Sequence, residues 1–116
     1  MKYMCLIYDD EKKVGVMSKG DSDIFMGEYD TFTEAIKKSG HYVSGHALQP
    51  VANATSIRVR HGKVATSDGP FAETKEQLGG YYLIEAKDLN DALHIASRIP
   101  SARTGTIEVR PVMVFD

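Results

Sequence analysis

The chain has 116 residues, of which 42% are hydrophobic and 26% are charged. This size and composition predict one globular domain covering residues 1–116 and exclude a disordered or fibrous protein. The 14 basic and 16 acidic residues give a net charge of -2, without the basic excess of a nucleic-acid-binding surface. We therefore expect no DNA or RNA partner.

The single cysteine, Cys5, lies in the apolar run 3–8 and excludes an internal disulfide. A lone thiol suits a reducing compartment, and we expect Cys5 to be a small buried side chain. The apolar run is too short for a signal peptide, and Asp9-Asp10-Glu11 follows it at once. These features predict a cytoplasmic protein without a membrane partner.

Residues 2–8 read as a β-strand that is apolar on both alternating faces, as in a central strand covered on both sides. A turn-rich segment, 9–20, precedes a predicted helix. In that helix, apolar residues recur at helical spacing. Asp21, Ser22 and Asp23 are candidate caps for its amino-terminal end. Lys37 and Lys38, followed by Gly40, are typical of a helix carboxyl end. The recurring residues are Phe25, Tyr29, Phe32 and Ile36.

A second strand is predicted over residues 41–48. Residues 55–60 and 63–66 then flank His61-Gly62, which predicts a β-hairpin with a two-residue turn. On its first arm, the apolar side chains of Ile57 and Val59 alternate with Arg58 and Arg60.

The segment 68–80, DGPFAETKEQLGG, begins with a strong turn at Asp68-Gly69-Pro70. Thr74 and Gln77 match a capping box, which predicts one helical turn over about 75–78 that Gly79 would end. A strand over 80–86 follows, then a helix capped by Asn90 and stopped by Pro100. The last strand, 106–115, contains Pro111 and is therefore expected at an edge or a bulge.

Without the inserted hairpin, the predicted order is strand, helix, strand, strand, helix, strand. This βαββαβ order predicts a ferredoxin-like α+β fold, with an antiparallel sheet and both helices on one face. Two helices leave the other face of the sheet uncovered, although the first strand is apolar on both faces. A second copy of the sheet is the economical cover, so we predict a homodimer through the open sheet face, with a cavity between the sheets.

Asp68 is the best candidate for a catalytic carboxylate, because a rigid turn would hold it beside a partly apolar cavity suited to acid-base chemistry. Two simpler alternatives stay open. Asp68 could cap the turn by bonding to the backbone just beyond it. The charges that follow, at Glu73, Lys75 and Glu76, could form an ordinary solvated surface.

Among the four histidines, His46 lies near the end of a strand and is the candidate proton-transfer partner. His41 and His46 are five residues apart, on opposite faces of a regular strand, so no metal site is predicted. His61 and His94 are expected in solvent. No phosphate-binding loop or nucleophile motif is present, and no cofactor is predicted.

Residues 68–85, DGPFAETKEQLGGYYLIE, resemble the signature of the DGPF-type branch of the YCII-related family. The resemblance extends from MKYM at 1–4 through LQP at 48–50 to EVRPV at 108–112. It implies a dimeric α+β barrel. This branch is often found beside sigma-factor genes, and one relative is a dehydrochlorinase acting on a chlorinated hydroxyquinol.

Smaller relatives are thought to use a histidine and aspartate pair in the cleft between subunits. Their histidine is expected in the first helix, whereas residues 21–38 contain none, so His46 would have to substitute for it. The insertion at 55–66 prevents Asp68 from being matched to the relatives' aspartate.

The leading hypothesis is a cytoplasmic homodimer whose cleft binds a small molecule, with an aromatic compound as one candidate. Asp68 would accept or donate a proton with His46 as its partner, in chemistry of the lyase or isomerase type. Arg58, Glu73 or Lys75 would orient a polar substrate group. The alternatives are a non-catalytic ligand-binding or regulatory module linked to a transcription (sigma) factor, and a scaffold without a small-molecule site.

Overall fold

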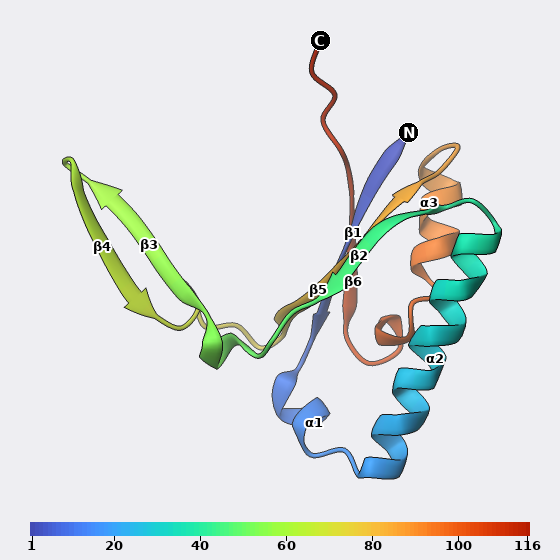
Figure 1. Cartoon of the computed structure of the whole chain (residues 1–116), viewed down its shortest axis with the longest axis horizontal. Helices are drawn as coiled ribbons and strands as arrows, with labels where there is room; N and C mark the ends of the chain where they lie inside the picture. Colours follow the sequence, from blue (N-terminus) through green and yellow to red (C-terminus); the bar gives the residue numbers. More distant parts are fainter.

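The chain folds into a four-stranded antiparallel sheet covered by helices and a separate two-stranded hairpin (Figure 1). The computed structural model describes residues 1–116. The strands are β1 (Lys2–Asp9), β2 (Tyr42–Ala47), β3 (Thr55–Arg60), β4 (Lys63–Asp68), β5 (Gln77–Glu85) and β6 (Thr106–Pro111). The helices are α1 (Glu11–Gly15), α2 (Lys19–Lys38) and α3 (Leu89–Ala96), with 3-10 turns η1 (Val51–Asn53) and η2 (Pro100–Ala102).

The four-stranded sheet has the order β2-β5-β1-β6, and the hairpin consists of β3 and β4. With the hairpin and the short helices set aside, the element order is β1, α2, β2, β5, α3, β6. The predicted ferredoxin-like fold is confirmed, as are the central position of β1 and the edge position of the strand containing Pro111. No helix combines the length and apolar character that a membrane span needs.

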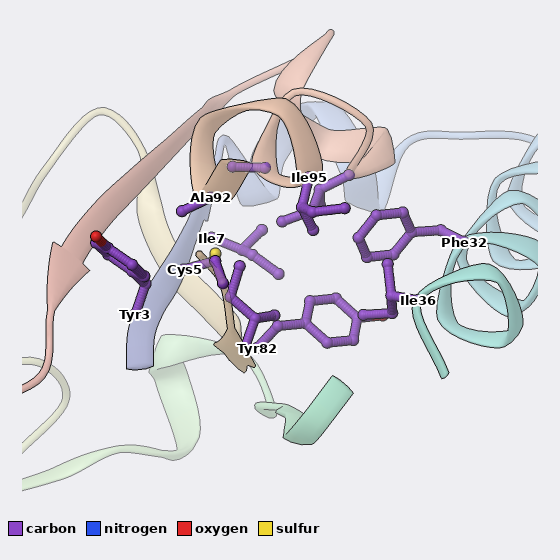
Figure 2. Packing of buried hydrophobic residues seen from close by; sticks show 12 residues of the cluster. Tyr3, Cys5, Ile7, Phe32, Ile36, Tyr82, Ala92 and Ile95 are labelled. Atoms are coloured by element: carbon purple, nitrogen blue, oxygen red, sulfur yellow. The ribbon is translucent and has the colours of Figure 1, made fainter. Parts of the chain in front are cut away.

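The core lies between the sheet and the pair α2 and α3 (Figure 2). From the sheet, Tyr3, Cys5 and Ile7 of β1 and Tyr82 and Ile84 of β5 point into it. The helical side is formed mainly by Phe32, Ile36, Ala92, Ile95, Ala96 and Ile99. The predicted burial of Cys5 is confirmed, and burial raises the pKa of its thiol to about 11.

The register between β1 and β5 explains why only half of the apolar residues of β1 are buried. Tyr3 faces Ile84 and Cys5 faces Tyr82, and both pairs lie under the helices. Met4 faces Leu83 and Leu6 faces Tyr81 on the other side of the sheet, where no helix packs. These residues remain partly exposed. The sheet therefore has one covered face and one open face.

The β3–β4 hairpin turns at His61 and Gly62, whose φ angles of 53° and 74° are those of the predicted two-residue turn. The hairpin projects away from the body of the protein (Figure 1). At its base, the Gly69 amide donates to the Ala54 carbonyl at 2.7 Å, and Gly69 has a φ of 91°, which favours glycine.

Two predicted helix starts were wrong. Ser18, not the segment 21–23, caps α2 by accepting from the Asp21 amide at 3.1 Å, so the helix begins earlier than its apolar pattern indicates. Asp88 caps α3 by accepting from the Asp91 amide at 2.9 Å, in place of Asn90. The segment expected to contain only turns also includes α1, capped by Asp10.

The predicted helical turn at 75–78 was also wrong. Gln77 is instead the first residue of β5 and pairs with Asp9 of β1. The Gln77 amide group donates to the Thr74 carbonyl at 2.6 Å and accepts from the Glu11 amide at 3.0 Å. Pairing with β1 therefore replaces the local capping box, and Gly79 lies inside the strand.

The last strand ends at Pro111, earlier than the predicted residue 115. The Val112 amide makes one more bond, to the Lys2 carbonyl at 2.9 Å. Its neighbour β1 begins at Lys2, so residues 113–116 have no strand to pair with.

Candidate functional site

The open face of the sheet carries two rows of side chains that cross all four strands. One row contains His46, Tyr81, Leu6 and Glu108, and the next contains Ser44, Leu83, Met4 and Arg110. Cross-strand partners in an antiparallel sheet share a face, so these eight side chains form one surface. Its centre is apolar and its two edges are polar. At a strand spacing of about 4.8 Å, the edges are separated by about 14 Å.

At the β2 edge, His46 and Tyr81 form a hydrogen-bonded pair. The His46 Nδ1 lies 2.9 Å from the Tyr81 hydroxyl oxygen, and their ring centroids are 5.8 Å apart. The other imidazole nitrogen, Nε2, has no partner within the protomer. An imidazole held by one nitrogen with the second nitrogen accessible is an arrangement suited to proton transfer.

Gly80 explains how β2 approaches β5 so closely beside this pair. A Cβ atom at Gly80 would lie 2.8 Å from the His46 carbonyl oxygen. Gly45, the neighbour of His46, is equally restricted, because its Cβ would lie 2.8 Å from a ring carbon of Tyr82. A larger residue at Gly80 would push against the backbone of β2 at His46, and one at Gly45 would collide with the Tyr82 ring.

At the β6 edge, Arg110 pairs with Glu108, and the guanidinium donates to the carboxylate. Both side chains belong to the open face by register. Tyr81, Glu108 and Arg110 were not among the site residues predicted from the sequence. Their alternation with buried residues in β5 and β6 was the signal that could have found them, once the open face had been predicted.

The structure places Asp68 at the end of β4, opposite Thr55 and exposed to solvent. Its carboxylate makes no hydrogen bond or ion pair in the protomer, so the alternative role as a cap of the following turn is wrong. The turn is held by other groups, including the Ser56 hydroxyl, which donates to the Gly69 carbonyl at 2.9 Å.

The other predicted substrate-binding residues are also exposed. Arg58 lies on β3 and belongs by register to the hairpin face opposite Asp68. Glu73 and Lys75 lie in the irregular segment before β5. Within one protomer, no hydrogen bond or ion pair joins Asp68, Arg58, Glu73 or Lys75 to His46.

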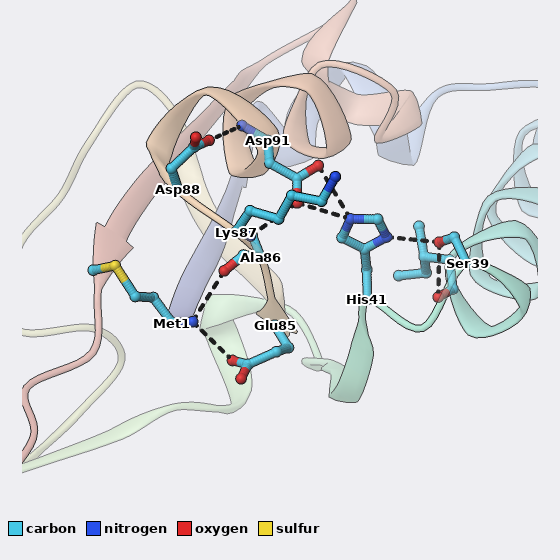
Figure 3. Close-up of polar contacts among 9 residues, drawn as sticks. Met1, Ser39, His41, Glu85, Ala86, Lys87, Asp88 and Asp91 are labelled. Carbon is cyan, nitrogen blue, oxygen red and sulfur yellow. Dashed lines mark hydrogen bonds and ion pairs between the residues drawn. The ribbon is translucent and has the colours of Figure 1, made fainter.

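A second polar cluster joins Ser39, His41 and Asp91 (Figure 3). The His41 Nδ1 lies 2.7 Å from the Ser39 hydroxyl, and its Nε2 lies 3.1 Å from an Asp91 oxygen. The Lys87 amide donates to Asp91 and, with the smaller contribution of His41, holds the pKa of that carboxyl below its usual value.

This cluster ties the end of α2 to the start of α3. The Ser39 hydroxyl already donates to the Ile36 carbonyl at 3.2 Å, as in a helix end. Neither the cleft beside α2 nor the cleft on the hairpin is lined by these three residues. Despite its serine, histidine and aspartate, the cluster is therefore a structural link.

A surface cleft of about 560 Å³ lies between α2 and η2 on the helical side of the molecule. It contains Arg103, whose guanidinium is already paired with Glu28 at 2.7 Å, and none of the predicted site residues. A smaller cleft of about 240 Å³ lies on the hairpin and includes Arg58 and Phe71. No group of three His, Cys, Asp or Glu side chains is arranged to hold a metal ion.

The fold and the open face define a ferredoxin-like α+β protein with an uncovered, partly apolar sheet surface and a polar pair at its edge. The family model of the YCII-related domain matches residues 1–116, and the chain belongs to the YCII-related family. It is similar to the uncharacterized protein R00369 of Rhizobium meliloti (strain 1021), with 35% identity over 117 residues. That match covers 99% of this chain and 94% of the relative.

Proposed function

We propose that the protein is a homodimer whose facing sheets enclose a cleft, and that this cleft carries out acid-base chemistry on a small molecule. The observation that carries the proposal is the His46 to Tyr81 hydrogen bond on an uncovered apolar sheet face. We further propose a cytoplasmic location, which suits the single buried thiol.

The dimer is supported by the composition of the open face. Met4, Leu6, Tyr81 and Leu83 form a contiguous cross-strand block, and none of them is covered by the protomer's own helices. Contiguous apolar surface of this kind marks an interaction or ligand site in soluble proteins. A two-fold arrangement lets the same face cover itself, because an isologous interface uses one patch on both subunits.

The chemistry is supported by the exposed Nε2 atom of His46. When the Nδ1–H donates to the Tyr81 hydroxyl, Nε2 has a free lone pair and can take a proton from a bound ligand. The resulting imidazolium keeps its Nδ1–H bond to Tyr81 and can return the proton to another ligand atom. This sequence corresponds to a lyase-like or isomerase-like reaction with no change in oxidation state of the protein.

The remaining polar groups have supporting roles in the proposal. Asp68 is the candidate second acid or base, and it must come from a chain segment outside the sheet. Arg58, Glu73 and Lys75 lie on the same outer segments and are candidates for orienting a charged substrate group. At the opposite edge, Arg110 could hold an anionic group in exchange for its bond to Glu108.

A non-catalytic module that binds a small molecule, acting with a transcription-factor partner, is the second candidate. It is favoured by one observation: Glu108 and Arg110 already neutralise each other, which leaves the apolar surface without an unpaired charge at its β6 edge. Such a surface needs only shape and apolar contact to hold a ligand.

The test is a ligand-observed NMR screen with a panel of phenols and aromatic carboxylates, followed by titration of the His46 imidazole. An enzyme of the proposed type shows a bound probe that shifts the His46 resonances, and His46→Gln abolishes turnover of that probe. His94→Gln, at an exposed position on α3, is the matched control. A probe that binds equally well to His46→Gln and is not converted supports the binding module.

Asp68→Asn separates the roles of that residue. Turnover that falls while thermal stability is unchanged supports a chemical role in the assembled site. A large loss of stability with unchanged probe binding would contradict a catalytic role for Asp68.

A further inference from the structure

The β3–β4 hairpin has two unlike faces. Ile57, Val59 and Val64 share one face by register, and they are 65%, 57% and 65% exposed. Arg58, Arg60 and Lys63 lie on the other face. An apolar side and a basic side are typical of a hairpin that packs one face against protein and turns the other to water. In the protomer, nothing covers the apolar side.

The hairpin is also unsupported as a unit. Its strands pair only with each other, and it extends away from the body (Figure 1). The radius of gyration is 16.2 Å. A compact domain of this length would have about 13 Å. A two-stranded hairpin alone is marginally stable in water, so such an extended element needs a surface to pack on.

The C-terminal segment is a second exposed apolar element. Met113, Val114 and Phe115 are 73%, 86% and 82% exposed and form no regular structure. The principal extents of 48 × 47 × 18 Å describe a flat molecule, and Figure 1 shows the hairpin and this segment leaving the body in different directions. One protomer therefore exposes two apolar protrusions, neither of which covers the other.

We propose that the hairpin is an arm that docks on a second copy of this chain, with its Ile57, Val59 and Val64 face against the C-terminal segment of that copy. A two-fold axis makes the exchange reciprocal, so one interface covers both protrusions in both protomers. A second copy is the occupant because the chain itself supplies the complementary apolar surface. The basic face of the arm stays in solvent.

The arm leaves the sheet at the end that carries the His46 pair. His46 is the residue before the last of β2, and the chain runs from there through η1 into β3. It returns from β4 through residues 69–76 to β5, where Tyr81 lies. A docked arm thus fixes the segment bearing Asp68, Glu73 and Lys75 beside the cleft. This consequence rests on the proposed function, whereas the docking itself does not.

The first test compares two triple variants by sedimentation equilibrium in about 0.15 M salt, which limits long-range charge effects. Ile57→Thr/Val59→Thr/Val64→Thr removes apolar surface but keeps β-branched side chains. Arg58→Thr/Arg60→Thr/Lys63→Thr is the matched control on the opposite face. We expect the dimer dissociation constant to rise at least about tenfold in the first variant and less than about threefold in the control.

A double-mutant cycle tests the partner surface. Met113→Ser/Val114→Ser/Phe115→Ser should weaken the dimer to a similar degree, and combining it with the apolar arm variant should add little further loss. Fully additive losses would show that arm and tail do not contact each other and would overturn their pairing.

Amide hydrogen exchange on the unmodified protein keeps the test valid even if the variants misfold. Docking predicts that amides of β3 and β4 become protected as the concentration rises through the dimer transition. Equal exchange in monomer and dimer, or an apolar arm variant that dimerises like the original chain, would overturn the arm. A dimer with a protected arm but no response of His46 to the phenol panel would count against the proposed function alone.

Discussion

The two faces of the central sheet are similar in sequence but differ in surroundings. On β1, Tyr3, Cys5 and Ile7 are buried under α2 and α3, while the equally apolar Met4 and Leu6 remain partly exposed. The difference arises because both helices pack on the same face. Met4 and Leu6 are apolar but do not belong to the protomer's own core. Exposed apolar residues grouped in this way are typical of a surface that binds a partner or a ligand.

Neighbouring residues of β5 show the same contrast in their polar groups. The hydroxyl of Tyr82 is 2.7 Å from Thr33 on the covered face, and burial raises the pKa of that phenol. The hydroxyl of Tyr81 is 2.9 Å from the exposed His46. The first hydrogen bond satisfies the core, and the second lies where a ligand can reach it.

The largest expected difference between the faces is in core stability. Ile84→Ala, at a position with 0% exposure, should lower the free energy of unfolding by about 2 to 5 kcal/mol. Its neighbour Leu83→Ala should cost less in dilute protein, and its cost should grow with concentration as dimers form. Urea denaturation at two protein concentrations measures both. Equal, concentration-independent costs would mean that the open face is already covered within the protomer.

The second difference is in thiol reactivity. Cys5 has a pKa of about 11 against an ordinary value of 9.0, because it is buried. Both values lie above pH 8, so ionisation alone should slow its labelling by a thiol reagent about 100-fold relative to the unfolded chain. Leu6→Cys places a second thiol on the open face, and peptide mass spectrometry distinguishes the two. At low concentration the new thiol should react much faster; similar slow rates would contradict an open face.

The sequence predicted the covered half of the fold well. Three features depend on a period or a backbone angle that local sequence determines. They are the alternation in residues 2–8, the apolar residues at helical spacing from Phe25 to Ile36, and the His61-Gly62 turn. Packing of one layer on another then follows from these periods. The uncovered face was predicted by the same reasoning, because two helices cannot cover both sides of one sheet.

The predicted helical turn at 75–78 was wrong because local and long-range partners compete there. Thr74 to Gln77 has the pattern of a capping box, but Gln77 pairs with β1 and receives the Glu11 amide instead. The candidate site was only partly predicted for the same reason. His46 was chosen for its place near a strand end, while its partner Tyr81 depends on the register between β2 and β5, which no local pattern specifies.

The third prediction uses the two adjacent tyrosines. Tyr82→Phe should cost about 1 kcal/mol of stability, because it leaves the Thr33 hydroxyl without its partly buried partner. Tyr81→Phe should cost clearly less but should move the titration of His46, followed by NMR of the imidazole protons. If Tyr81→Phe leaves that titration unchanged, the hydrogen bond has no influence on His46, and its proposed role in proton transfer fails.

The smallest expected effect is on the pH dependence of stability, and it compares an aspartate that accepts hydrogen bonds with one that accepts none. Asp91 accepts hydrogen bonds from Lys87 and His41, which lower its pKa from the ordinary 3.8, whereas Asp68 makes no such bonds. A lowered pKa in the folded state gives stability that is present above about pH 3.8 and is lost as the pH falls through the lower folded value. Asp91→Asn should therefore be less stable at neutral pH, and its deficit should shrink in acid.

Thermal unfolding followed by circular dichroism from neutral pH into strong acid measures this convergence, with Asp68→Asn as the charge-matched control. The control should track the unmodified chain through the same acid range, because no native contact is lost with its carboxylate. Curves for Asp91→Asn that stay parallel to the unmodified chain would show that the link between α2 and α3 does not depend on the ionised carboxylate. Convergence in Asp91→Asn alone would identify the ionised Asp91 carboxylate as a structural element and leave Asp68 available for its proposed role.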